Sequence, residues 1–135
     1  MRTQLYLVAR KFAAPASLAF ALQLLPLAPA MAQDAAKVDP KHYKVEFEND
    51  QVRVLRITYG PHEKSVMHSH PASVAVFLTD ANVQFTTPDG KKGPAVAKTG
   101  SVQWEAAVSH LPENLGDKPF ELIQIELKGK HAKTK

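Results

Sequence analysis

Phe-Glu-Leu-Ile-Gln-Ile-Glu-Leu, residues 120–127, is the stretch of this chain that best defines its secondary structure. Within it, Ile123 and Ile125 alternate with Gln124 and Glu126. A two-residue period is typical of a β-strand, because successive side chains of a strand point to opposite faces of the sheet. The stretch therefore predicts a strand near the C-terminal end of the fold.

Similar short runs, rich in β-branched and aromatic residues, fill the chain from Tyr43 onward. The predicted strands are 45–47, 52–59, 66–70, 74–79, 83–87, 95–98, 102–104 and 120–128. Turn signals separate several of them, at Asn49-Asp50, Gly60-Pro61 and Pro88-Asp89-Gly90. No segment after residue 32 shows a helical period of useful length. Many short strands in roughly 100 residues predict an all-β sandwich or barrel.

Residues 1–32 have the composition of a secretory signal peptide. Three basic residues, Arg2, Arg10 and Lys11, precede an uncharged stretch that is rich in Ala and Leu. This stretch, residues 12–32, ends in the cleavage pattern Ala30-Met31-Ala32. Three prolines in this stretch argue against the competing interpretation, a membrane-spanning helix. We therefore expect a periplasmic or secreted protein that keeps no stable membrane anchor after cleavage.

The rest of the chain divides into a loose leader (33–42), one β-barrel domain (43–128) and a basic, disordered tail (129–135). The whole chain has 17 Lys and Arg against 13 Asp and Glu, but three of the basic residues belong to the predicted signal. The body is therefore nearly neutral, and it carries no basic stripe with interleaved aromatics, so nucleic-acid binding is not expected. The absence of cysteine excludes disulfides and thiolate metal sites.

Three histidines are the main candidates for function. In a strand, the side chains of His68 and His70 point to the same face, which places two imidazoles next to each other. His110 follows after enough chain for a barrel to bring it beside this pair. Imidazole binds Zn, Fe, Ni, Cu and Mn, and three protein ligands leave coordination positions open.

The two histidine motifs resemble those of the cupin superfamily. The first motif of cupins reads Gly, spacer, His-x-His, and Gly60 precedes His68-Ser69-His70 in this chain. The second reads Gly, spacer, His, three residues, Asn, which matches Gly100, His110 and Asn114. The resemblance covers about residues 45–128 and implies a double-stranded β-helix, or jelly-roll, barrel. It also implies a homodimer, since small cupins commonly associate through their sheets.

The chain departs from the cupin pattern at the glutamate of the first motif. That glutamate is expected at position 74 or 75, which here are Val74 and Ala75. Three explanations are open: a three-histidine site, a replacement ligand, or a pocket that has lost its metal. The candidates for replacement are His62, Glu63 and Glu113.

These observations lead to a hypothesis for the function. His68, His70 and His110 are expected to hold a divalent metal, Fe(II), Zn or Mn, in a dioxygenase-like oxidoreductase acting on a small organic molecule. His62 and Glu63, in the loop before the first histidine, are candidates for proton transfer. The alternatives are a non-catalytic module that binds a small molecule or a metal, and a structural dimer with a relic pocket.

Overall fold

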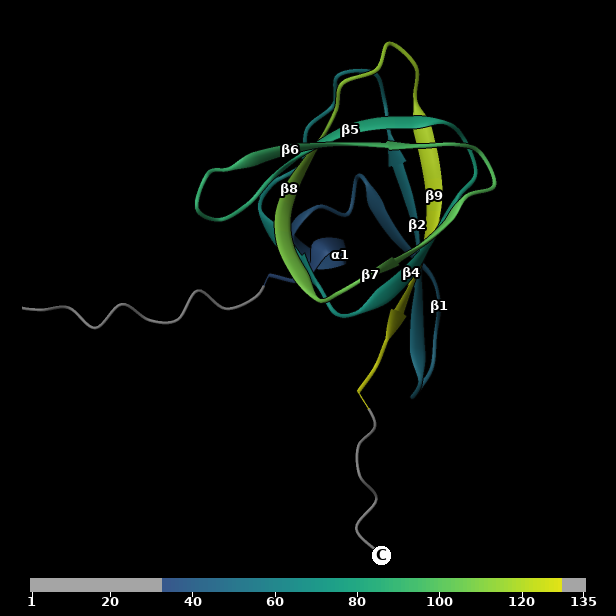
Figure 1. The fold of residues 1–135 in the computed structure, drawn as a ribbon. Helices are drawn as coiled ribbons and strands as arrows, with labels where there is room; N and C mark the ends of the chain where they lie inside the picture. Colours follow the sequence, from purple (N-terminus) through teal and green to yellow (C-terminus); the bar gives the residue numbers. More distant parts are fainter. Residues whose placement is uncertain (1–32, 130–135) are drawn as a thin grey trace, which may run out of the picture.

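The structure is a computed structural model that describes residues 33–129, and nearly all of its regular elements are strands (Figure 1). The predicted signal peptide, and all of the predicted tail except Gly129, lie outside the described residues. The elements are α1 (Ala35–Val38), β1 (Tyr43–Glu48), β2 (Val52–Tyr59), β3 (His68–His70), β4 (Ser73–Phe77), β5 (Ala81–Thr86), β6 (Lys92–Ala97), β7 (Val102–Glu105), β8 (Val108–Asn114) and β9 (Phe120–Leu127). Within residues 33–129, no helix is long and apolar enough to cross a membrane.

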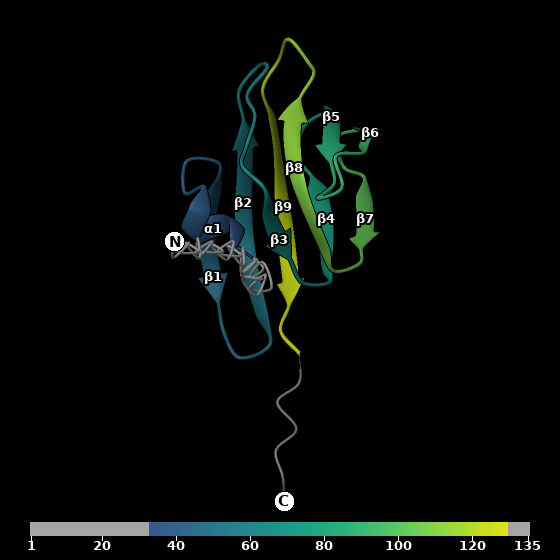
Figure 2. The ribbon, with the colours of Figure 1, turned by 90° about the vertical axis from the view of Figure 1, so that its left-hand side faces the viewer.

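The strands form two sheets that curve around a common interior (Figures 1 and 2). One sheet has the order β1-β2-β9-β4-β7, and the other has the order β3-β8-β5-β6. Every pair of neighbouring strands is antiparallel. Strands distant in sequence, such as β2 and β9, therefore lie side by side. This architecture confirms the prediction of an all-β barrel.

Two predicted turns join hairpins, and one strand was not predicted. The Asn49 side chain accepts hydrogen bonds from two backbone amides between β1 and β2, and Gly90 has a φ of 82° in the β5–β6 turn. The unpredicted strand is β8, which carries His110 and Asn114. Its signal was weak because it contains Pro112, a residue that normally argues against a paired strand.

The core lies between the two sheets and is built from apolar residues of most strands. Its fully or nearly buried members are Ala35, Tyr43, Leu55, Ile57, Tyr59, Ala75, Phe77, Ala81, Val83, Ala97, Phe120 and Leu122. A barrel interior needs large apolar side chains, so the sequence predicts that Phe77, Phe85 and Trp104 are core residues. Phe77 belongs to the core, and Phe85 packs against it. The same prediction for Trp104 is wrong, because its side chain faces outward and is 64% exposed.

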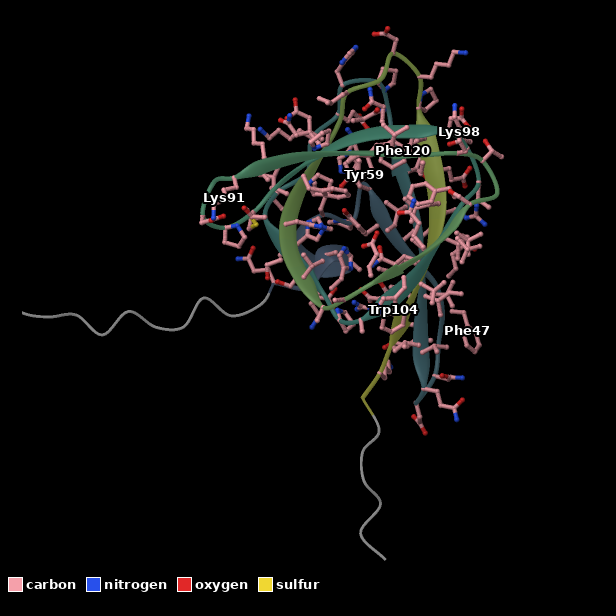
Figure 3. The ribbon with its side chains drawn as sticks, viewed as in Figure 1. Phe47, Tyr59, Lys91, Lys98, Trp104 and Phe120 are labelled. Atoms are coloured by element: carbon pink, nitrogen blue, oxygen red, sulfur yellow. The ribbon has the colours of Figure 1, made fainter. Side chains whose placement is uncertain are left out.

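Trp104 belongs to an apolar row on the outside of the five-stranded sheet. The strand registers align Phe47, Val54, Ile125, Val74 and Trp104, one residue from each strand. Figure 3 shows Phe47 and Trp104 on the outer surface, and Tyr59 and Phe120 inside the barrel. Because β9 carries apolar residues on this outer face, its polar residues Gln124 and Glu126 face the interior.

The prediction of a loose leader over residues 33–42 is wrong. Asp34 caps the short helix α1, and Ala35 is completely buried. The backbone carbonyl of Gln33 accepts a hydrogen bond from the amide of Ser69 in β3 (2.7 Å). His42, expected to be exposed because it lies near the end of the fold, is only 5% exposed. Packing against β1 and β3 orders this segment despite its polar, Ala-rich sequence.

Candidate metal centre

The three predicted histidine ligands meet inside the barrel. His68 and His70 point inward from β3, and the β3–β8 register places His110 directly opposite His68. Their ring centroids lie 4.9–5.4 Å apart. One ligand nitrogen from each ring lies within 4.8 Å of the other two, and all three side chains are buried. This arrangement fits the binding of a single metal ion by three imidazoles.

The hydrogen bonds of the histidines leave ligand nitrogens free. The Nδ1 of His68 lies 2.8 Å from the carbonyl oxygen of Val66, while its Nε2 is buried without any partner among residues 33–129. The Nδ1 of His70 lies 2.6 Å from Glu126. His110 stacks on Phe85. An orphaned, buried Nε2 beside two further imidazoles fits a metal-bound nitrogen, since buried polar atoms rarely lack a partner.

Burial also keeps two of the rings in the neutral form that binds metal. Desolvation, followed by the proximity of His70, lowers the pKa of His68 to about 4. Desolvation and the two neighbouring histidines lower the pKa of His110 to about 3. Both rings are therefore unprotonated at neutral pH, so a metal ion need not displace a proton from either of them.

A buried ionic chain that the sequence did not reveal supports His70. Glu126 is 1% exposed and joins His70 to Arg53, whose Nε donates to the second carboxylate oxygen at 2.6 Å. Arg53 also donates to Asp34, at 2.5 Å. Burial opposes ionisation of Glu126, but the bonds to His70 and Arg53 outweigh it and lower its pKa. Such a carboxylate fixes the orientation of the imidazole and makes it a stronger ligand.

The centre opens onto a cavity of about 50 Å³ inside the barrel. His70 and His110 form part of its wall together with Glu105, Gln103 and Gln124. The remaining wall is mainly apolar and aromatic. The cavity therefore borders two of the three histidines, His70 and His110.

Neither position of the missing glutamate offers a ligand. Ala75 faces the interior and is 1% exposed, while Val74 lies in the outer apolar row. The carboxylates nearest in register are Glu126 and Glu105, both of which lie opposite Ser73 on the strands that flank β4. Within the described residues, the compact ligand group contains the three histidines alone.

The residues proposed as replacement ligands or proton carriers lie elsewhere. His62 is exposed and pairs with Asp117 (2.8 Å), and Glu113 pairs with Lys64 (3.6 Å). Glu63 bonds to Lys41 and to the amide of Gly60 (2.7 Å). None of the three candidates lines the cavity. Proton transfer by His62 or Glu63 thus remains a prediction without a direct contact to the centre.

Glu63 reaches the centre only through other side chains. Its carboxylate lies 3.1 Å from His42 Nε2, and His42 Nδ1 lies 2.6 Å from Asp39. Asp39 accepts a hydrogen bond from Ser65, whose Oγ is 3.4 Å from His68 Nδ1. The hydrogen bond from Lys41, the largest influence, and that from the Gly60 amide lower the pKa of Glu63 to about 2. A carboxylate this acidic is a weak general base near neutral pH.

Comparisons with known proteins support the fold. No protein-family model matches the chain, and no curated protein matches it in sequence. A cupin-domain protein from Bordetella pertussis Tohama I has a similar structure, with a TM-score of 0.60 and 25% identity over 64% of this chain and 92% of that chain. A conserved protein with a double-stranded β-helix domain from Klebsiella pneumoniae has a TM-score of 0.52 and 18% identity over 65% of this chain and 76% of its own.

An RmlC-like cupin from Methanocaldococcus jannaschii has a TM-score of 0.51 at 17% identity, covering 67% of this chain and 84% of that chain. Likeness at this level of identity concerns the fold. The described part of this chain therefore has the double-stranded β-helix fold of the cupin superfamily, as its two histidine motifs predicted.

Proposed function

We propose that His68, His70 and His110 hold one divalent metal ion, Fe(II), Zn or Mn, in a metal-dependent oxidoreductase that acts on a small organic molecule. The observation that carries this proposal is the buried Nε2 of His68, which has no hydrogen-bond partner among residues 33–129. It belongs to a group of three buried histidines, each of which offers a ligand nitrogen within 4.8 Å of the other two. Leaving such an atom unsatisfied costs about 1–3 kcal/mol, and a bond to a metal ion removes that cost.

The protein contributes positioning and a shaped cavity with a mainly apolar wall. Glu126 holds His70, and Phe85 packs flat against the ring of His110 at a centroid distance of 4.7 Å. The rings of Tyr43 and His68 pack edge to face, with their centroids 4.7 Å apart. A metal held here supplies Lewis acidity and, with iron or manganese, redox chemistry at the positions the protein leaves open.

Metal analysis of protein purified without an affinity tag tests the proposal. We expect close to one metal ion per chain in the wild type and almost none in the His68→Ala/His110→Ala variant. His62→Ala is the matched control, because this histidine is exposed and remote from the cavity. Equal, substoichiometric metal in all three proteins would refute the proposed centre.

Oxygen uptake then separates an oxidoreductase from a non-catalytic binding module. The metal-loaded protein is assayed with small thiols and diketones. Consumption of oxygen should disappear in the His68→Ala/His110→Ala variant. Tight retention of a ligand without turnover across these classes would instead favour the binding module.

Export is a separate part of the proposal and follows from the predicted cleavage after Ala32. Gln33, the next residue, already bonds to β3, and Asp34 pairs with Arg53. Mass spectrometry of the periplasmic fraction should find a chain that starts at Gln33. An uncleaved chain confined to the cytoplasm would contradict export without affecting the metal centre.

A further inference from the structure

Glu105 is a carboxylate of the cavity wall that the proposed metal centre does not use. Its strand, β7, places Trp104 outside, so Glu105 and Gln103 face inward. The side chain of Glu105 forms no hydrogen bond or ion pair with any residue in the range 33–129. The side chain of Glu126, the other carboxylate opposite Ser73, has two partners. Burial raises the pKa of Glu105. A partly buried carboxylate without a partner is suited to pair with a ligand.

The rest of the wall also favours positive charge. The aromatic residues of the cavity wall are Tyr43, Tyr59, Phe77, Phe85 and Phe120. Aromatic rings attract cations through their negative faces, and the attraction is stronger where water is excluded. Gln124 donates to Ser73 (3.0 Å), which leaves its side-chain oxygen as a further acceptor. No Lys or Arg lines the cavity among the described residues.

The size of the cavity limits the ligand. One water molecule needs about 10–15 Å³ on this measure, so 50 Å³ corresponds to roughly four water-sized atoms. A ligand that also reaches the metal therefore has only a short chain between its two ends.

We propose that the cavity selects a small organic cation, whose ammonium group pairs with Glu105 while its other end binds the metal held by the three histidines. This inference rests on the proposed metal centre and adds the class of its ligand. The positive metal ion favours a thiolate, alkoxide or similar donor, and Glu105 favours an amine at the opposite end. A small dicarboxylate is disfavoured because its second carboxylate faces Glu105.

Three thiols on the Co(II)-loaded protein test this proposal: 2-aminoethanethiol, 2-mercaptoethanol and mercaptoacetate. They share a sulfur donor and chain length, and differ in a positive, neutral or negative second group. Binding is followed by the sulfur-to-cobalt charge-transfer absorption. We expect the wild type to bind the ammonium thiol about ten- to a hundredfold more tightly than the carboxylate thiol, the range of a charge-assisted hydrogen bond.

Glu105→Gln should abolish most of this preference and leave the cobalt spectrum without thiol unchanged. Glu113→Gln is the matched control, because that carboxylate lies on the outside and pairs with Lys64. Equal affinities for the three thiols in the wild type, or an unchanged preference in Glu105→Gln, would overturn the proposal. A changed cobalt spectrum in thiol-free Glu105→Gln would also overturn it, by making Glu105 a metal ligand. Failure of the wild type to bind Co(II) would refute the metal centre itself.

Discussion

Replacing Glu126 by Gln tests whether the buried ionic chain supports both the fold and the metal centre. Glu126 is 1% exposed. Its carboxylate accepts a hydrogen bond from Arg53 and pairs with His70, each at 2.6 Å. A neutral amide has one oxygen and one amide nitrogen, so it can keep only one of these contacts as an acceptor. Hydrogen bonds to charged groups contribute about 1.5–3 kcal/mol each.

The expected loss follows from what remains in the variant. Asp34 still pairs with the Nη1 of Arg53, so the guanidinium keeps one carboxylate. The cost should therefore fall below the 3–5 kcal/mol typical of a fully broken buried pair, at about 2–3 kcal/mol. We also expect metal affinity to fall about 10- to 100-fold, because His70 loses its charged partner.

Equilibrium urea unfolding of the metal-free protein, followed by circular dichroism, measures the change in the free energy of unfolding. Glu121→Gln is the matched control, since Glu121 lies on the same strand but pairs with the half-exposed Arg56 on the outside. Exposed pairs contribute about 0–1 kcal/mol. Equal losses in the two variants, or unchanged metal affinity in Glu126→Gln, would refute the reasoning.

Three further predictions concern the centre and the outer sheet. The folded-state pKa values of His68 and His110, about 4 and 3, lie below that of an unfolded histidine, so the unfolded chain binds these protons first. The free energy of unfolding of the metal-free protein should therefore be constant above about pH 6.5. Below that pH it should fall by up to about 2.7 kcal/mol per pH unit, because two protons are bound on unfolding. A urea midpoint that stays the same from pH 7 to pH 5 would contradict this. Ala75→Glu should destabilise the metal-free protein, because it buries a carboxylate, and should recover stability when Co(II) is added. Equal destabilisation with and without Co(II) would show that a carboxylate at this position does not reach the metal. We expect a second copy of the chain to cover the outer apolar row. The double variant Phe47→Lys/Trp104→Lys should therefore be a monomer in sedimentation equilibrium, and the wild type a dimer. A monomeric wild type would disprove the homodimer.

Much of the fold was predictable because its signals are local. The two-residue period of residues 120–127, the turn at Pro88-Asp89-Gly90 and the spacing of His68 and His70 each depend on neighbouring residues alone. They identified strands, a hairpin and a shared histidine face. Strand β8 lacked such a signal because Pro112 interrupts the pattern.

The sequence by itself determined the all-β character, the three histidines that could hold a metal ion, and the absence of a glutamate at positions 74 and 75. Only the tertiary structure decided which face of each strand is inside. Both faces of β9 carry large apolar residues, so alternation does not reveal that Glu126 points inward. The partners of Glu126 are 56 and 73 residues away in sequence, at His70 and Arg53. Closure of the barrel brings these residues together. It also exposes Trp104 and directs Glu105 into the cavity. These orientations depend on strand register, which the local sequence does not reveal.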